Sequence, residues 1–198
     1  MEINTVAVNN LRQEMVKVSK QIFDRNLTSG TSGNISARVP GYPTQVLIKA
    51  SGTCFGDVES EDFVLVDLDG NVLQGVKKPS KEVRFHLGIM KIRPDVQAIV
   101  HGHSTHATAY ATKKGEMPIV TAAAEAGLHQ VGIVGFALPG SEELAKMTIE
   151  PFKDETLKAV VLQKHGFVTV GADIHKAFYL ADVLEDNAIV ACLMDQLS

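Results

Sequence analysis

The chain has 198 residues, 45% of them hydrophobic and 21% charged, with a formal net charge of -4. This length and composition predict one globular domain over residues 1–198 that buries a substantial core. The negative balance argues against a nucleic-acid surface, no apolar segment approaches the roughly 18 residues of a membrane span, and no leader pattern opens the sequence. Cys54 and Cys192 give no disulfide framework, so we expect a cytoplasmic protein without nucleic-acid or membrane partners.

The first half of the chain predicts a helix followed by short strands. Apolar residues recur at helical spacing from Leu11 to Ile22, which predicts an amphipathic helix over about residues 5–25. Turn residues then separate strand patterns at 35–39, 46–50, 63–68 and 71–73. The dipeptide Asp69-Gly70 between the last two patterns predicts a hairpin, which requires an antiparallel pair.

The second half alternates helices with apolar runs. Ser80 is expected to be the N-cap of a helix that cannot continue past Pro94. Further helices are expected from about Ser104 and from about Ile174, with apolar segments between them. This mixture predicts an α/β fold in which helices pack on a sheet that contains antiparallel pairs.

Histidines at two places form the sharpest motif of the chain. His101 and His103 follow the apolar run 96–100, and side chains at i and i+2 of an extended segment point the same way, so both imidazoles can face one ion. His165 ends a second apolar run and precedes a glycine that lets the chain turn, which suits a third ligand. Three neutral imidazoles with an open fourth position are typical of a catalytic zinc.

Three turns rich in glycine or hydroxyl residues are candidates for binding an anion. They are the turn that ends in Gly33 and Asn34, the pair Ser51-Gly52, and Ser80 at the expected helix start. Exposed amide groups beside strand ends and helix starts bind dianions readily. The first turn has an alternative explanation, because its glycines can simply supply positive φ.

These motifs together resemble those of a known family. The runs 78–86, 100–109 and 163–166 are similar, in order, to successive motifs of the class II sugar-phosphate aldolases. This is the family of L-fuculose-1-phosphate aldolase and L-ribulose-5-phosphate 4-epimerase, which shares its fold with the adducin head domain. The resemblance implies a single-domain class II aldolase fold, with a central, largely antiparallel sheet and helices on both faces.

The resemblance also implies roles for particular residues. Metal ligation of one Zn²⁺ per chain is implied for His101, His103 and His165. Glu82 falls where the aldolases keep their acid/base carboxylate, whereas the epimerases have an aspartate there, which favours carbon–carbon cleavage. The family's phosphate-binding positions correspond here to Asn34, Ser51, Gly52 and Ser80.

The implied chemistry is physically sensible. A divalent ion stabilises the negative charge that carbon–carbon cleavage leaves on the substrate, and a nearby carboxylate moves the protons. The start of a helix favours the ionised form of Glu82. Burial or substrate binding would therefore have to raise its pKa if the carboxyl is to hold a proton.

Two departures from the family pattern leave the reaction open. Lys81 stands where a second small hydroxyl residue is usual, and the run 78–82 looks more like decarboxylases of 3-oxo-tetronate 4-phosphates. A cation there either binds phosphate or neutralises a substrate carboxylate. The segment 119–125 lacks the tyrosine that the fuculose-phosphate aldolases use as a proton donor, so Glu125 or a water is the alternative donor.

The leading expectation is a zinc-dependent aldolase that cleaves a ketose 1-phosphate, of the L-fuculose 1-phosphate type, to dihydroxyacetone phosphate and a short aldehyde. The alternative is a 3-oxo-tetronate 4-phosphate decarboxylase on the same metal site. A ribulose-phosphate epimerase and a non-catalytic adducin-like module are less favoured. The expected partners are a small sugar phosphate and further copies of the chain in a homotetramer, with the active site at a subunit boundary.

Overall fold

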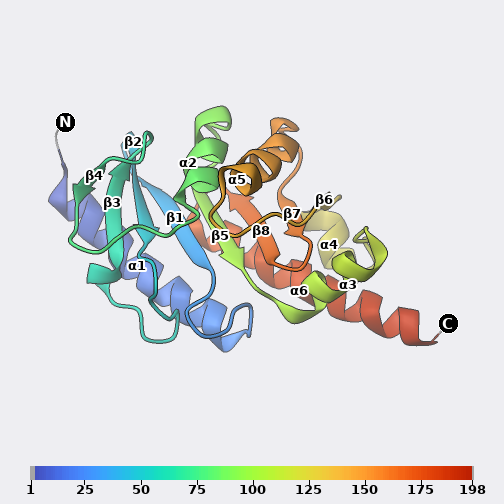
Figure 1. Cartoon of the computed structure of the whole chain (residues 1–198). Coiled ribbons are helices and arrows are strands. Elements are labelled where there is room, and N and C mark those ends of the chain that lie inside the picture. Colours follow the sequence, from blue (N-terminus) through green and yellow to red (C-terminus); the bar gives the residue numbers. More distant parts are fainter. Residues whose placement is uncertain (1–2, 198) are drawn as a thin grey trace.

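The computed structural model describes residues 3–197, and its strands form one mixed sheet that runs through the molecule (Figure 1). The strands are β1 (Asn34–Val39), β2 (Tyr42–Lys49), β3 (Phe63–Asp67), β4 (Val72–Gln74), β5 (Ala98–Gly102), β6 (Gly132–Val134), β7 (Ala159–Leu162) and β8 (Gly166–Gly171). Their order in the sheet is β4-β3-β2-β1-β5-β8-β7-β6. Neighbouring strands are antiparallel except β6 and β7, which are parallel. The prediction of a largely antiparallel sheet is therefore confirmed, and so is the hairpin at Asp69-Gly70, which joins β3 and β4.

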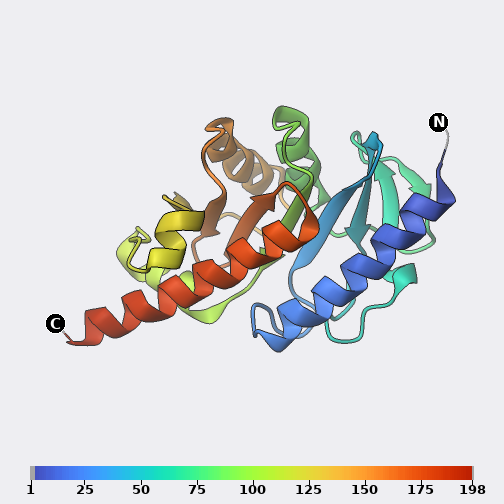
Figure 2. The ribbon, with the colours of Figure 1, turned by 180° about the vertical axis from the view of Figure 1, so that it is seen from behind.

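Helices cover both faces of this sheet (Figures 1 and 2). They are α1 (Thr5–Asp24), α2 (Val83–Ile92), α3 (Thr105–Lys114), α4 (Ala122–Gly127), α5 (Glu142–Ile149) and α6 (Ile174–Leu197), with short 3-10 turns η1 (Ser60–Asp62) and η2 (Glu150–Lys153). The apolar residues of α1, α3, α4 and α6 form one core with the sheet, and those of α2 and α5 form a second core on the opposite face. This confirms the arrangement with helices on both faces. Within residues 3–197, no helix combines the length and apolar character that a membrane crossing requires.

The two cores decide which way the side chains of each strand point. In β5, Ala98 and Val100 belong to the core under α1 and α6, whereas Ile99 belongs to the core under α2 and α5. The period of two along a strand then turns His101 toward the α2 side. There its ring meets the edge of the Phe85 ring, with centroids 5.5 Å apart.

The predicted helix after Ser80 is present, but its predicted first residue is wrong because the helix begins later. α2 starts at Val83, and Glu82 occupies the N-cap position. The residues before it are extended and pair with the end of β2, where the Ser80 amide donates to the Lys49 carbonyl at 3.1 Å. An extended segment cannot supply a first helical turn. The Ser80 hydroxyl oxygen instead accepts a hydrogen bond from the Glu82 amide at 3.2 Å.

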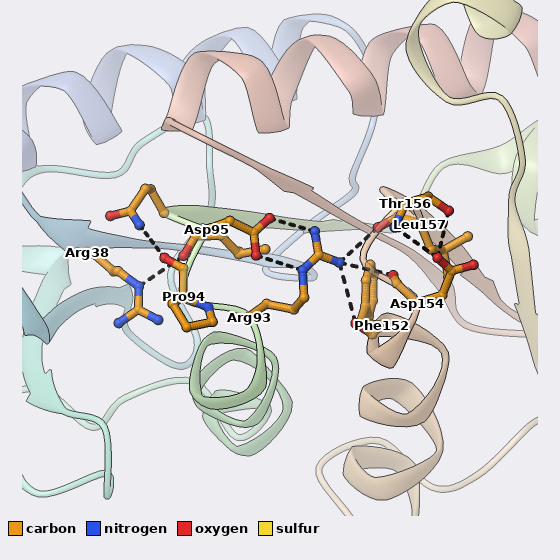
Figure 3. A network of polar contacts seen from close by, with 10 residues as sticks. Arg38, Arg93, Pro94, Asp95, Phe152, Asp154, Thr156 and Leu157 are labelled. Atoms are coloured by element: carbon orange, nitrogen blue, oxygen red, sulfur yellow. Dashed lines mark hydrogen bonds and ion pairs between the residues drawn. The ribbon is translucent and has the colours of Figure 1, made fainter.

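A buried arginine holds the far end of α2 in place (Figure 3). Arg93, which directly follows α2, forms a two-pronged ion pair with Asp95 over 2.8 and 2.7 Å. Its remaining guanidinium nitrogen donates to three backbone carbonyls, at 3.4, 3.2 and 3.4 Å, of Phe152, Asp154 and Leu157. Because these carbonyls belong to η2 and the chain before β7, the network fixes α2 against the second half of the sheet. At the opposite end of α2, the N-cap residue Glu82 lies against His101 and His165.

Candidate active site

Three histidines predicted as metal ligands meet where β5 and β7 end. His101 is the fourth residue of β5 and is fully buried, His103 lies just beyond that strand, and His165 lies in the turn between β7 and β8. One ring nitrogen from each of the three lies within 4.8 Å of the others. The Nε2 atoms of His101 and His103 are 3.0 Å apart. The geometry thus brings together the residues that the spacing and the resemblance singled out.

The protonation of these rings fits a bound cation. His101 donates its Nδ1–H to the Phe167 carbonyl at 2.7 Å, so its Nε2 carries the lone pair that faces His103. A backbone carbonyl that accepts the proton of the other ring nitrogen in this way fixes the tautomer of metal-bound histidines. Burial, followed by the neighbouring His101, lowers the pKa of His103 to about 3 and that of His165 to about 4. Three imidazoles whose ring nitrogens lie within 4.8 Å of one another form a donor set that suits a divalent metal.

Glu82 lies against the same nitrogens. Its Oε2 is 3.1 Å from the Nε2 of His101, its Oε1 is 3.2 Å from the Nε2 of His165, and Asn34 donates its Nδ2–H to Oε2 at 2.9 Å. Burial alone raises the pKa of Glu82, but the neighbouring rings of His101 and His165 and the hydrogen bond from Asn34 hold it well below its ordinary range. The carboxylate is therefore ionised. It is set up to accept a proton first, and burial alone does not give the raised pKa that holding a proton would need.

Two glycines allow neighbouring backbone segments to lie close to the strand that carries His101. Gly33 has a φ of +72°, and a Cβ there would lie 2.7 Å from the His101 carbonyl oxygen. At Gly166, a Cβ would lie 2.1 Å from the Gly102 carbonyl oxygen. The start of β8 can therefore lie this close to the end of β5 only if residue 166 is glycine. The left-handed residue of the β7–β8 turn is Lys164, with a φ of 59°, and not Gly166. The expectation that Gly166 supplies the turn is thus replaced by a packing role.

A cavity of about 280 Å³ opens above the histidines. Its lining includes every residue predicted to bind phosphate, together with three of the residues predicted to transfer protons or bind metal: Gly33, Asn34, Ser51, Gly52, Ser80, Lys81, Glu82, His103 and His165. Residues far apart in the chain are therefore brought to one site. A larger cavity of about 440 Å³, beside Arg93 and Tyr179, lies away from the histidines.

The predicted anion turns do not all offer their amide groups. The Ser51 amide donates to the Lys78 carbonyl at 2.9 Å, and the Ser80 amide donates to the Lys49 carbonyl at 3.1 Å. These two amides are consumed by the pairing of residues 78–80 with the end of β2. Their hydroxyl groups, which border the cavity, are the donors that remain for an anion.

Sequence analysis missed a buried lysine under the same cavity. The side chain of Lys49 is 1% exposed, donates to the Gly33 carbonyl at 3.2 Å, and lies over the Phe55 ring at 4.8 Å from its centroid. Burial lowers the pKa of this lysine to about 8. One signal was available: Lys49 is a lone cation inside the apolar run of β2.

The groups considered as replacements for the missing tyrosine lie elsewhere. Among residues 3–197, no tyrosine belongs to the lining of this cavity. Tyr179 borders the larger cavity instead. Glu125 is exposed on α4 and also lies outside the lining.

Comparison with known proteins gives the family. The family model of the class II aldolase and adducin N-terminal domain matches residues 13–192, so the chain belongs to the class II aldolase family. Its class is that of the aldolase lyases, which use a divalent metal. The resemblance seen in the motifs is thereby confirmed.

Individual relatives are aldolases that act on sugar phosphates. The chain is 32% identical to an L-fuculose phosphate aldolase of Methanococcus maripaludis over 93% of this chain and 97% of that protein. It is 34% identical to a 5-deoxy-D-ribulose 1-phosphate aldolase of Bacillus thuringiensis serovar kurstaki, over 88% and 80% of the two chains. A solved L-fuculose 1-phosphate aldolase superposes with a TM-score of 0.88 at 29% identity, covering 96% of this chain and 88% of that one. All three comparisons extend over most of the chain.

Proposed function

We propose that this class II aldolase is a zinc enzyme that cleaves a ketose 1-phosphate, of the L-fuculose 1-phosphate type, to dihydroxyacetone phosphate and a short aldehyde. The observation that carries the proposal is the Glu82 carboxylate, 3.1 and 3.2 Å from the Nε2 atoms of His101 and His165, beside a cavity bordered by hydroxyl groups. The relatives named for L-fuculose phosphate and 5-deoxy-D-ribulose 1-phosphate support ketose 1-phosphates as the shared substrate class.

Glu82 is the proposed proton carrier. Its ionised carboxylate accepts the proton of the substrate hydroxyl whose oxygen becomes the aldehyde oxygen, while the electron pair of the breaking carbon–carbon bond moves onto the ketose fragment. The same carboxyl then returns the proton to the carbon of that fragment, which completes dihydroxyacetone phosphate. One Zn²⁺, which His101, His103 and His165 would hold, would supply electrostatic stabilisation of the negative charge that develops on the ketose fragment.

The opposite end of the cavity is the proposed phosphate site. The hydroxyl groups of Ser51 and Ser80, the Gly52 amide and the second Nδ2–H of Asn34 are suitable donors for its oxygens. Lys49 adds a buried positive charge below them, and the Gly33 carbonyl holds that lysine in place. Lys81 adds a second, exposed cation at the rim.

The test separates the possible products. Zinc-loaded protein is incubated with a panel of ketose 1-phosphates and 3-oxo-tetronate 4-phosphates, and dihydroxyacetone phosphate and carbon dioxide are measured separately. We expect dihydroxyacetone phosphate from a ketose 1-phosphate and no carbon dioxide. Protein that releases neither product from any member of the panel, with full metal content, would contradict the proposal.

The second candidate function is decarboxylation of a 3-oxo-tetronate 4-phosphate. It is favoured by one observation, the exposed Lys81 at the rim of the cavity, where its charge can neutralise a substrate carboxylate. Carbon dioxide without dihydroxyacetone phosphate in the same panel would identify this reaction.

We also propose a homotetramer, located in the cytoplasm, in which a neighbouring copy completes the site. The cavity ends at Pro139 and Gly140, and the adjacent loop presents Phe136 and Leu138 with 51% and 68% of their surfaces exposed. Apolar side chains beside a site that lacks a tyrosine suit a subunit contact. Both cysteines are free thiols, as expected in a reducing compartment. Sedimentation that finds activity only in the assembled fraction supports the tetramer, and an active monomer refutes it.

A further inference from the structure

A chain of buried hydrogen bonds leads away from Glu82 into the core. Asn34 donates its Nδ2–H to Glu82 Oε2 at 2.9 Å, and the other end of the same amide, Oδ1, contacts Nε2 of His86. The second ring nitrogen of His86, Nδ1, lies 2.7 Å from Ser36 Oγ. His86 and Ser36 are both fully buried. Neither residue reaches the cavity, so the chemistry proposed above does not use them.

The direction of each hydrogen bond follows from the ionised end of the chain. A carboxylate only accepts, so the amide nitrogen of Asn34 must face Glu82 and its oxygen must face His86. His86 must then donate from Nε2, which leaves Nδ1 as an acceptor, and Ser36 must donate to it. Burial, as the largest cause, lowers the pKa of His86 to about 3, so the ring is neutral and has a single N–H to place.

The regular spacings of a strand and a helix bring these residues together. Asn34 and Ser36 are two residues apart in β1, so their side chains share one face, and Asn34 is the cross-strand neighbour of His101 in β5. Glu82 and His86 are four residues apart at the start of α2, so they also share one face. The Phe85 ring stacks against His86 with centroids 4.7 Å apart and holds its plane.

We propose that His86 is a positioning residue of the active site, which orients the Asn34 amide so that Glu82 is held against the metal-binding histidines. Without the His86 donor, only the hydrogen bond to Glu82 holds the Asn34 amide in its present orientation, and the buried Oδ1 of Asn34 loses this partner. The charge-assisted hydrogen bond that holds Glu82 is then less firmly fixed. The inference rests on the proposed role of Glu82 in the reaction.

The first experiment needs neither substrate nor mutation. Nitrogen-15 NMR of the wild-type protein with labelled histidine reports which nitrogen of His86 carries the proton. We expect the Nε2–H tautomer across the neutral pH range. An Nδ1–H tautomer would overturn the inference whatever the enzyme's substrate is.

The second experiment compares two replacements of His86. His86→Phe keeps a flat ring beside Phe85 but has no donor, whereas His86→Gln keeps an N–H directed toward Asn34. We expect the Phe variant to lose about tenfold to a hundredfold in turnover, with metal content unchanged, and the Gln variant to recover most of that loss. His175→Phe, on the other face of the sheet, is the matched control and should retain wild-type turnover.

A double-mutant cycle separates positioning from packing. If His86 acts through Asn34, adding His86→Phe to Asn34→Ala should reduce turnover no further. Additive losses, equal losses in the Phe and Gln variants, or wild-type turnover in the Phe variant would each overturn the inference. If the Phe variant does not fold, Ser36→Ala replaces it, with a smaller loss and a second His86 tautomer expected. An inactive wild-type protein would instead count against the proposed function.

Discussion

At the histidine end of the cavity the functional side chains are mostly buried and lie on or beside paired strands, whereas the phosphate end adds exposed turns to the buried Asn34 and Ser80. His101 is 0% exposed and Glu82 is 8% exposed; the sheet register places Asn34 beside His101, and Asn34 donates a hydrogen bond to Glu82. Ser51, Gly52 and Lys81 are exposed and follow the end of a strand or precede a helix. Lys49 gives the phosphate end a buried charge, and Lys81 adds an exposed one.

This difference suggests a division of labour. Groups that move protons or hold a metal work best in a dry site with preset geometry, because the electrostatic interactions are then stronger and need no rearrangement. Groups that capture a phosphate must remain open to solvent. Changes at the histidine end should therefore reduce turnover or metal content, and changes at the phosphate end should mainly raise KM.

The largest effect should come from removing a histidine. His101→Ala or His165→Ala leaves two imidazoles, which cannot hold the ion firmly, so we expect both metal and activity to be lost. The loss in activity should exceed the roughly 10–100-fold loss that follows when a group hydrogen-bonded to a metal ligand is removed. Elemental analysis checks the metal, with His175→Ala as a control. Full metal occupancy in both variants would contradict the ligand assignment.

Glu82→Gln should come next. The amide keeps the shape of the side chain but cannot accept the substrate proton, so turnover should fall on the order of a hundredfold or more while metal remains bound. Steady-state and single-turnover assays, with elemental analysis, measure both properties. Unchanged turnover would move the acid/base role elsewhere, and Glu125→Gln tests the remaining candidate.

A smaller effect is expected at the phosphate end, from Lys49→Met. Loss of the buried charge should raise KM for the phosphorylated substrate about tenfold, with little change in turnover. The pKa of about 8 adds a pH dependence, because the wild-type lysine loses its charge as pH rises through that value. Wild-type affinity should therefore weaken above pH 8, and the Met variant should show no such step. A KM that stays constant in both proteins would remove Lys49 from the phosphate site.

The same replacement should stabilise the protein. The pKa of Lys49 is about 8 in the folded chain against 10.5 for the ordinary side chain, so the unfolded chain binds more protons between these values. Wild-type stability should therefore rise with pH from about 8 to 10.5. At pH 7, Lys49→Met should be more stable by roughly 2 kcal/mol, after allowance for the lost bond to Gly33. Urea unfolding at several pH values measures this, and a less stable variant would contradict it.

The smallest effect should come from Lys81→Ser. Lys81 is exposed, so solvent screens its charge, and its removal should raise KM for a ketose 1-phosphate only about twofold or threefold. The variant also helps to distinguish the proposed aldolase from the alternative decarboxylase. A much larger loss, confined to substrates that carry a carboxylate, would favour the decarboxylase.

Local patterns were sufficient for part of the molecule. The spacing in α1 and α6 indicated their helices, Asp69-Gly70 indicated the hairpin, and the spacing of His101 and His103 placed two rings on one side of a strand. Each of these depends on residues a few positions apart, where helix and strand geometry set the side-chain direction. The domain assignment over residues 1–198, the site roles and the tetramer stay predictions.

The tertiary structure alone decided how the site is completed. The start of α2 moved because residues 78–80 pair with the end of β2, and that pairing also consumed two amides expected to bind phosphate. The burial of Lys49 and the contact of Asn34 with Glu82 arise in the same way. Strand order, register and burial are set by packing between distant segments, and no local pattern in the sequence encodes which segments become neighbours.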